Sequence, residues 1–473
     1  MSRASIRSLT RQHIPYIRKN SPTIPCRYQS TSTLPNSSPS TTSPSVPAVK
    51  ENELAKIIRD TIKSTGPIPI SRYMQFCLSH PTYGYYQKGD VFGEKGDFIT
   101  SPEISQIFGE LVAIWFLTRW MESGSPKKVR LVELGPGRGT LMDDILRTLF
   151  SFPGVSEAVQ SIHLVENSEA LRNVQGTKLS QRLDRKDVDL NWYTGINEVP
   201  ETEDTYTFVV AHEFFDAMPI NTFEKTDMGW REVQVDNDPA YTPGLSTQSS
   251  KSGLRLSISP SPTPLSTVLP ATSPRFAKLS KGSRIEVAQD SFKIMRRIGE
   301  LLGNKGKNAA SGAGAASGGC GVVVDYGGDR SYGQSFRAFK NHKIVDIFDD
   351  PGNADLTANV DFAYLRESLD STGSSALGPI SQSSFLLSLG LQPRLKKLID
   401  SATNENRKED IRKSAQRLID PLGMGGQYQV MGITSDSDSG KTTTTKEEIY
   451  PFITPKPQSQ VLQPQSQSKV LKP

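Results

Sequence analysis

Residues 129–141 read VRLVELGPGRGTL, which predicts a strand, a tight turn and the start of a helix. The stretch begins with a mostly apolar run, which is typical of a strand that a parallel sheet buries on both faces. The glycines Gly135, Gly137 and Gly139 then let the backbone turn sharply and come close to a ligand. Residues 140–150 favour a helix, whose free N-terminal N–H groups point toward a bound nucleoside.

The spacing of the glycines indicates which nucleoside is bound. The dinucleotide fingerprint G-x-G-x-x-G needs a third glycine where this chain has Thr140. Glu133, two residues before the first glycine, would repel a pyrophosphate, but it suits the cationic amino-acid end of S-adenosyl-L-methionine. S-adenosyl-L-methionine is therefore the predicted cofactor. An NAD-dependent oxidoreductase and an ordinary strand-to-helix turn are the other interpretations.

The first 50 residues differ from the rest in charge. They contain seven Lys and Arg, no Asp or Glu, and many Ser and Thr, which is typical of a mitochondrial transit peptide. A disordered basic arm is the alternative. Of 55 basic and 50 acidic residues in the chain, 48 basic and 50 acidic remain beyond this leader. The charge therefore gives no reason to expect a nucleic-acid partner.

Cysteine usage and hydropathy argue against several other classes of protein. Cys26, Cys77 and Cys320 are far apart and form no C-x-x-C pair, so neither a disulfide framework nor a zinc site is predicted. The histidines are scattered, and no metal site of any kind is predicted. No apolar run reaches the length that a membrane span needs.

Strand and helix signals alternate beyond the glycine turn. Apolar, strand-like runs occupy residues 161–166, 190–194, 206–211, 229–235 and 320–326. A helix is predicted over residues 168–183, after the first of these runs. This alternation predicts a doubly wound α/β sheet.

Three helices are predicted before the glycine turn. They are expected at residues 51–63, at residues 70–80 with Ser71 as N-cap, and from Ser101 as N-cap through Trp115, with one buried face. The stretch between the second and third helices is rich in glycine and aromatic residues, as functional loops often are. Its tyrosines are expected either to cover the cofactor or to pack in a core; they are Tyr83, Tyr85 and Tyr86.

Composition divides the chain into four parts. They are a leader, a helical and loop segment, an α/β domain and a polar tail (residues 1–50, 51–125, 126–432 and 433–473). Two insertions interrupt the α/β domain, at residues 237–275 and 303–319. Both insertions and the tail are predicted to be disordered, because they have too little apolar surface to offset the entropy of ordering.

Acidic residues follow the predicted strands at the edge where open α/β sheets bind ligands. Glu166 ends the second strand of the sheet and is predicted to accept hydrogen bonds from both ribose hydroxyls, with helix capping as the alternative. Asp325, at the end of the last of these runs, is assigned a supporting or substrate-binding role.

The fourth strand ends in HEFFDAMP, residues 212–219, which supplies the candidate catalytic residues. Glu213 and Asp216 can hold a guanidinium bidentately and orient one nitrogen for attack. Its proton must leave, and a carboxylate or His212 can receive it. Capping of the next helix by one of the two carboxylates is the alternative.

Seven motifs occur in this order along the chain. They are GPIPISRYMQFCLSHPTYGYY (66–86), GDFITSPEISQIFGE (96–110), LVELGPGRGTL (131–141), HEFFDAMPI (212–220), GWREVQV (229–235), VVVDYGG (322–328) and FRAFKNHKIVDIFDDPGNADLTANVDF (336–362). Through these motifs the chain resembles the MidA-like family, mitochondrial complex I assembly factors that are protein arginine methyltransferases.

The resemblance implies a class I, Rossmann-like, seven-stranded methyltransferase fold with an added helical segment, and S-adenosyl-L-methionine as methyl donor. It implies symmetric dimethylation of an arginine on a core subunit of the peripheral arm of complex I, in the mitochondrial matrix. It places the cofactor on Gly135, Gly137 and Gly139, with its ribose on Glu166. A non-catalytic assembly chaperone that retains the fold is the alternative, and the oligomeric state is left open.

Overall fold

Residues 129–141 have the predicted structure. β2 (Val129–Leu134) is buried along its whole length, the three glycines turn the chain, and α5 (Thr140–Leu149) follows directly. The structure is a computed structural model, and it describes residues 51–87, 100–183, 187–202, 204–242, 251–303, 318–436 and 449–453. The predicted leader, residues 1–50, lies outside this range.

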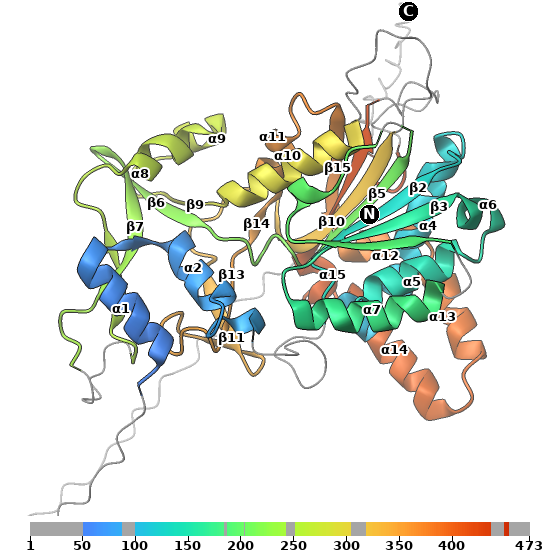
Figure 1. Cartoon of the computed structure of the whole chain (residues 1–473), viewed down its shortest axis with the longest axis horizontal. Coiled ribbons are helices and arrows are strands. Elements are labelled where there is room, and N and C mark those ends of the chain that lie inside the picture. Colours follow the sequence, from blue (N-terminus) through green and yellow to red (C-terminus); the bar gives the residue numbers. More distant parts are fainter. Residues whose placement is uncertain are drawn as a thin grey trace, which may run out of the picture. The chain divides into compact units, whose positions relative to one another are not determined.

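The main sheet is built around β2. From one edge to the other its strands are β15 (Ser374–Ser381), β16 (Tyr428–Ser435), β10 (Gly319–Gly328), β5 (Tyr206–His212), β2, β3 (Val159–Val165) and β4 (Asp189–Tyr193), as Figure 1 shows. β16 is antiparallel to both neighbours, and the strands from β10 to β4 are parallel. The short β14 (Val360–Asp361) pairs with the end of β10. The predicted α/β sheet is confirmed.

Helices cover both faces of this sheet. One face packs against α4 (Ile107–Glu122), α5, α6 (Pro153–Ala158), α7 (Glu169–Leu183), α12 (Gln382–Ser388), α13 (Leu391–Asp400) and α14 (Glu405–Ile419). The other packs against α10 (Gln289–Gly303) and α11 (Phe362–Ser368). Successive strand residues enter different cores, since Leu131 belongs to the first and Val132 to the second. The sheet is therefore doubly wound.

A second sheet lies outside the doubly wound part. Its strands are β1 (Ile68–Pro69), β7 (Gly229–Asn237), β6 (Asn221–Thr226) and β9 (Arg284–Val287), and β8 (Leu254–Ile258) also pairs with β7. It shares an apolar core with α1 (Glu53–Thr65), α2 (Ile70–Ser79) and a small sheet of β12 (Lys343–Val345), β11 (Arg337–Lys340) and β13 (Asp355–Thr357). The short elements are η1 (Tyr85–Gln87), α3 (Ser101–Ile104), η2 (Ile196–Glu198), α8 (Pro264–Val268), η3 (Leu269–Ala271), α9 (Pro274–Ala277) and α15 (Met424–Gln427).

Both predicted serine caps are wrong. Ser71 lies inside α2, whose N-cap is Pro69, and its hydroxyl donates to Oδ1 of Asn221 at 2.8 Å. Ser101 is the first residue of α3 and not its N-cap, and the chain becomes extended at Ser105 before α4 begins. The tertiary partner of Ser71 on β6 explains why the local cap pattern fails there.

The prediction of one buried face for α4 is also wrong. This helix is buried nearly all round, because α5 and α13 pack on it as well as the sheet. It even buries Glu110, whose carboxylate accepts hydrogen bonds from Arg147 at 2.8 Å and Arg394 at 2.6 Å. These ion pairs allow a charged residue to lie in the core.

The insertion at residues 237–275 is partly ordered, against the prediction. It contains β8, α8 and η3, and it buries Leu254 and Leu269 completely or nearly so. β8 is held by pairing with β7, a long-range partner that local composition does not reveal. Of the second insertion, residues 304–317 lie outside the described part of the chain.

The predicted tail also begins too early. β16 extends to Ser435, and Phe452 is 5% exposed and belongs to the main core. Disorder is therefore wrong for the start of the tail and for residues 449–453. The other residues from 437 onward are not among those described.

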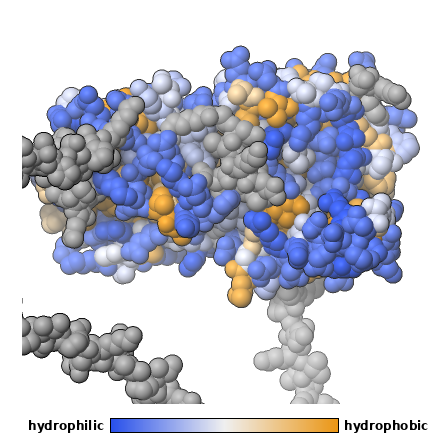
Figure 2. Space-filling view, turned by 90° about the horizontal axis from the view of Figure 1, so that it is seen from below, coloured by the Kyte–Doolittle hydropathy of each residue, from blue (hydrophilic) through white to orange (hydrophobic). Residues whose placement is uncertain are grey.

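The described residues contain neither a membrane-spanning helix nor a cluster of metal ligands. There, no helix is long and apolar enough to cross a bilayer, and no three His, Cys, Asp or Glu side chains are grouped to hold a metal. Cys77 and Cys320 are buried and form no disulfide with each other. The face in Figure 2 is mostly hydrophilic, with small separate apolar patches.

Candidate active site

The glycine turn after β2 has a backbone that side chains rarely allow. Gly135, Gly137 and Gly139 have φ values of 63°, 52° and 74°, all in the left-handed region. A Cβ on Gly135 would also lie 2.9 Å from Cδ2 of Phe214. The turn therefore needs glycine at Gly135 for two reasons, the conformation and the space.

A cavity opens beside this turn. It is lined by Thr100, Pro102, Glu103, Glu133, Gly135, Pro136, Gly137, Arg138, Thr140, Leu141 and His212. The end of β2, the glycine turn and the end of β5 form one side, and residues 100–103 contribute the other. The sequence predicted residues 100–103 only as a helix start, and their position at the cavity was missed.

Glu133 places a buried carboxylate at this cavity. Its side chain is 2% exposed, and Oε2 has no hydrogen-bond partner among the described residues. Burial, and then the nearby Glu166, raise the pKa of Glu133 to about 8, whereas Lys178 lowers it. A buried carboxylate oxygen without a partner fits a positively charged group, as the amino-acid end of S-adenosyl-L-methionine carries.

Glu166 lies just after β3 and is tied to the glycine turn. Its Oε1 accepts the N–H of Ser168 at 2.9 Å, and its Oε2 accepts from Nε2 of Gln175 at 3.2 Å. Gln175 Nε2 also donates to the carbonyl of Gly137 at 2.8 Å. Burial raises the pKa of Glu166, and these hydrogen bonds oppose that rise. Glu166 does not itself cap α7 (Glu169–Leu183), because the side chain and carbonyl of Ser168 accept the N–H groups of Leu171 and Arg172. Gln175 is a linking residue that sequence reasoning missed.

The turn after β5 is held by a buried carboxylate from β10. Oδ2 of Asp325 accepts the N–H groups of Phe214, Phe215 and Asp216 at 3.2, 2.8 and 3.3 Å. Glu213 itself has φ 49°, an unusual conformation for a residue other than glycine. Asp325 therefore has the supporting role, and it fixes a strained turn that carries Glu213.

Glu213 lies next to His212, but neither it nor Asp216 is among the residues that line the cavity beside the glycine turn. Oε1 of Glu213 lies 3.5 Å from Nε2 of His212 and has no hydrogen-bond partner in the described part of the chain. Burial, Asp216 and Glu103 raise the pKa of Glu213 to about 8, and hydrogen bonds from Tyr428 and the Ser101 backbone oppose this. An extra positive charge here would relieve the repulsion among the acids.

His212 is buried at the cavity wall and is neutral. Its ring packs edge-on to Phe108 at 4.9 Å and is stacked with Tyr428 at 6.3 Å. Burial lowers the pKa of His212 to about 3. Nε2 has no hydrogen-bond partner among the described residues, so it can accept or donate one bond to a ligand, but it takes up a proton poorly.

Asp216 lies on the side of this site toward the small sheet. Burial raises the pKa of Asp216 to about 6, whereas Arg337 on β11 lowers it. The Arg337 guanidinium is 5.9 Å from the centroid of the Tyr326 ring and donates to Oδ1 of Asn359 at 2.7 Å. The hydroxyls of Tyr326 and Tyr428 are hydrogen bonded to each other. Arg337 lies in the motif at residues 336–362, but sequence reasoning gave it no role, and Tyr428 lies in none of the seven motifs.

The three tyrosines of the N-terminal loop pack with the core of the second sheet. Tyr85 is 4% exposed, and Tyr83 and Tyr86 are half-buried against the same core. The Tyr86 hydroxyl donates to Oδ1 of Asp355 at 3.1 Å. Of the two predicted roles for these tyrosines, covering the cofactor or packing in a core, the structure shows core packing. Residues 88–99 of the predicted functional loop lie outside the described part.

Comparison with known proteins agrees with this geometry. The family described as putative S-adenosyl-L-methionine-dependent methyltransferase matches residues 111–380. The chain belongs to this family. The match confirms S-adenosyl-L-methionine as the cofactor, and the buried carboxylate of Glu133 and the glycine turn suit it.

Curated relatives cover most of the chain. The human "Protein arginine methyltransferase NDUFAF7, mitochondrial" is 37% identical over 403 residues, which is 81% of this chain and 84% of the relative. The zebrafish (Danio rerio) protein of the same name is 39% identical over 396 residues, covering 80% and 86%. The resemblance to the MidA-like family is confirmed.

Solved structures show the same fold. One similar structure is a protein from Burkholderia thailandensis bound to S-adenosyl-homocysteine. Its TM-score is 0.63 and its identity 24%, and the match covers 83% of this chain and 93% of the other. A second structure from that organism has a TM-score of 0.62 and 26% identity, covering 81% and 91%. The class I methyltransferase fold is thus confirmed.

Proposed function

We propose that this protein is a mitochondrial protein arginine methyltransferase. Its substrate is an arginine on a core subunit of the peripheral arm of complex I, and its product is symmetric dimethylarginine, formed in the matrix during assembly. Support comes from the relatives named as mitochondrial arginine methyltransferases, which match about four-fifths of the chain. The basic, acid-poor first 50 residues support the location.

The observation that carries the proposal is that Oε1 of Glu213 is buried and has no hydrogen-bond partner among the described residues. It is buried beside Asp216 and Asp325, so this end of the sheet groups three carboxyl groups with little positive charge to compensate their ionisation. A guanidinium is positively charged, flat and rich in donors, and it pairs well with carboxylates. Glu213 is thus proposed to bind the target guanidinium and to fix which nitrogen faces the cofactor.

Cofactor binding is assigned to the residues around the glycine turn. Gly135, Gly137 and Gly139 would hold the nucleoside by their backbone, Glu166 its ribose hydroxyls, and Glu133 the amino group. When bound, S-adenosyl-L-methionine supplies a methyl group activated by a positively charged sulfur. Little acid–base chemistry is then needed, and alignment of the nucleophile provides much of the rate.

A proton must leave the guanidinium nitrogen that forms the new N–C bond. Glu213 is proposed as its acceptor, because burial has already raised its pKa to about 8. The neutral His212, 3.5 Å away, is proposed to orient Glu213 or the substrate by its free Nε2. Asp216 is proposed to complete the carboxylate pair, with its charge partly balanced by Arg337.

Labelled methyl transfer tests this function. The full chain is incubated with methyl-labelled S-adenosyl-L-methionine and purified complex I subunits, and modified residues are mapped by mass spectrometry. We expect one arginine of a core subunit to be dimethylated, with fragment ions of the symmetric isomer. Asymmetric product would reject the type of methylation, and no product would reject the enzyme. A chain inactivated at Glu213 that still restores complex I assembly in cells would favour the chaperone alternative.

A further inference from the structure

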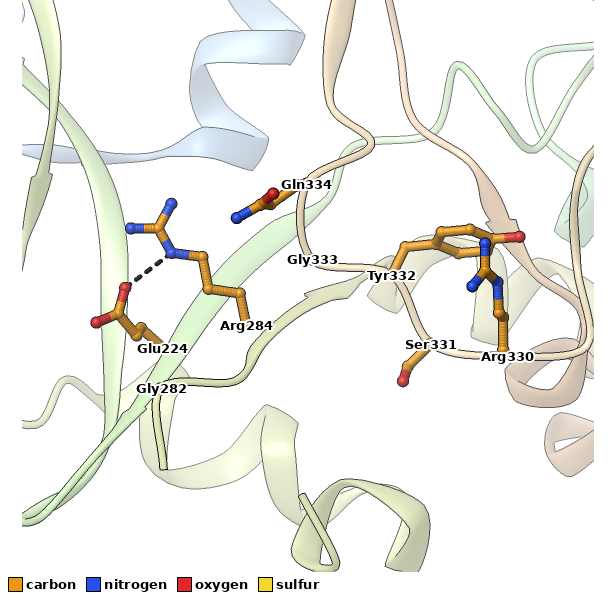
Figure 3. Close-up of a pocket in the computed structure, with 8 residues that line it drawn as sticks. All are labelled: Glu224, Gly282, Arg284, Arg330, Ser331, Tyr332, Gly333 and Gln334. Atoms are coloured by element: carbon orange, nitrogen blue, oxygen red, sulfur yellow. Dashed lines mark hydrogen bonds and ion pairs between the residues drawn. The ribbon is translucent and has the colours of Figure 1, made fainter. Parts of the chain in front are cut away.

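A second cavity lies between the second sheet and the loop that follows β10. It has a volume of about 600 Å³ and is lined by Glu224, Gly282, Arg284, Arg330, Ser331, Tyr332, Gly333 and Gln334, as Figure 3 shows. None of these residues lines the cavity beside the glycine turn. The volume is in the range of sites that bind small molecules or side chains.

The loop that forms this cavity begins and ends at the candidate active site. It leaves β10 at Gly328, two residues beyond Tyr326, whose ring lies near the Arg337 guanidinium, and it returns to the site at Arg337. Arg330 is four residues beyond Tyr326, so the two Cα atoms are at most about 14 Å apart. A peptide bound at the active site can therefore reach the cavity within a few residues.

The loop is fixed in place before any ligand arrives. Oε1 of Glu286, on β9, accepts the N–H groups of Ser335 at 2.7 Å and Phe336 at 3.2 Å, and the N–H of Glu286 donates to the Tyr332 carbonyl at 2.7 Å. A Cβ on Gly333 would lie 2.4 Å from the carbonyl oxygen of Arg284. The loop thus packs directly on β9, and the cavity is preformed.

The cavity presents two guanidinium groups and one carboxylate. Nε of Arg284 donates to Oε2 of Glu224 at 2.7 Å. The guanidinium of Arg330 lies 4.9 Å from the centre of the Tyr332 ring and forms no ion pair with a described residue. Its neighbour Asp329 is already paired with Arg366 at 2.7 Å. Positive charge is therefore in excess, and Tyr332 holds one cation in place.

Figure 3 shows how these side chains are arranged. Arg284 extends toward Gln334 on one side of the cavity, and Arg330 lies across Tyr332 on the other side. Arginine forks and an amide are suited to the two oxygens of a carboxylate. The charge is opposite to that of the acidic cluster around Glu213, so the two sites would select opposite charges along one peptide.

We propose that this cavity binds an Asp or Glu side chain of the protein substrate, about two to five residues from the target arginine. This inference rests on the proposed function, since it assigns the substrate specificity of that site. The target arginine enters the acidic cluster, and the acidic neighbour binds Arg330 and Arg284. Repulsion from the two arginines disfavours substrates with a basic residue at that position.

Peptide methylation tests the specificity. Synthetic peptides carry one arginine and a single Glu, Ala or Lys at each of the positions one to six residues away. For the full chain we expect kcat/KM to be roughly three- to tenfold higher with Glu than with Lys at the best position. Arg330→Glu should abolish or reverse this preference and leave kcat/KM for the Ala peptides unchanged. Arg412→Glu, on the exposed side of α14, is the matched control and should keep the preference.

A binding measurement separates this inference from the proposed function. Fluorescent peptides in which Ala replaces the target arginine cannot be methylated there, but their Glu and Lys forms still report on the cavity by anisotropy. One outcome is that the Glu forms bind more tightly, that Arg330→Glu removes this difference, and that no arginine peptide is methylated. This outcome would reject the methyltransferase function and support the assignment of the cavity. Methylation without a Glu preference, or with a preference that survives Arg330→Glu, would overturn the cavity assignment alone. If the Glu and Lys forms bind equally and no peptide is methylated, both the cavity assignment and the proposed function are overturned.

Discussion

Two turns leave the same edge of the main sheet, and both need backbone in the left-handed region. The turn after β2 meets this need with glycines, at φ 63°, 52° and 74°. The turn after β5 meets it with Glu213, at φ 49°. For glycine this conformation is nearly free of cost, but for another residue it costs about 1 kcal/mol or more.

The difference indicates what each turn is for. The first turn removes side chains, so that a ligand can approach the backbone, and Gln175 ties its Gly137 carbonyl to Glu166. The second turn keeps a charged side chain in a strained place, and Asp325 holds it there with three hydrogen bonds. Strain that is retained in this way is typical of functional residues. We therefore assign binding to the first turn and chemistry to the second.

The largest expected effect is on turnover, from Glu213→Gln. The amide keeps the size of the side chain but cannot accept the proton or attract the guanidinium, so methylation should fall about 10²- to 10³-fold. Affinity for S-adenosyl-homocysteine, measured by calorimetry, should not change. Turnover near the wild-type value would contradict the proposal that the second turn carries the chemistry.

The pH profile provides a second check on Glu213. Its pKa is raised to about 8, so the free enzyme gains the ionised form as the pH rises through 8. The value of kcat/KM, which reports ionisations of the free enzyme, should therefore increase with pH and level off above about 8. In Glu213→Gln this rise of kcat/KM with pH should be absent. If the rise persists in the variant, it arises from the ionisation of another group.

The next effect is on cofactor binding, from Gly135→Ala. The new Cβ would lie 2.9 Å from the Phe214 ring in a left-handed backbone, so the turn must shift. Affinity for S-adenosyl-homocysteine should fall at least about tenfold, while the far-ultraviolet circular dichroism stays native. Gly195→Ala is the control, since Gly195 has φ −153° and no neighbour within 4 Å of the new Cβ. Equal affinities in the two variants would contradict the binding role.

A smaller effect, on stability, is expected from Asp325→Ala. It leaves three buried N–H groups of the second turn without their acceptor, which costs on the order of 2–4 kcal/mol in the free energy of unfolding. Asp325→Asn retains a carbonyl oxygen and should lose clearly less. Urea unfolding of both variants measures this, and equal losses would show that the charge of Asp325, and not its hydrogen bonds, holds the turn.

The smallest effect is a gain in stability from Glu213→Gly. Glycine relieves the left-handed strain, so unfolding should require about 1 kcal/mol more, although methylation is lost. The raised pKa of Glu213 means that wild-type stability present below pH 4.5 is lost as the pH rises toward 8. The gain should therefore be larger at pH 8 than at pH 5. A loss of stability at both pH values would show that Glu213 supports the fold.

Local pattern was sufficient for the centre of the fold. The apolar runs predicted β2, β3, β5 and β10 to within a few residues, because strands buried in the sheet must be largely apolar. The edge strand β4 was also located, although it is only partly buried. The polar residues that end the strands, such as Glu166 and Glu213, could be placed at one sheet edge because parallel strands share their carboxyl ends. Their functional roles remain predictions that the proposed experiments test.

The same reasoning failed where the partner of a segment is distant. Leu254 is ordered because β8 pairs with β7, and α4 is buried nearly all round because α5 and α13 pack on it. Neither partner is visible in local composition. The links made by Gln175 and Arg337 also depend on contacts between separate elements.

Glycine spacing and apolar periodicity over a few residues were enough to predict the β2 turn, the cofactor and the positions of the central strands along the chain. The packing of distant segments sets which acids ionise and which polar atoms have no partner among the described residues. Burial and neighbouring charges set the pKa values of Glu133, His212 and Glu213, and both arise when distant segments pack together.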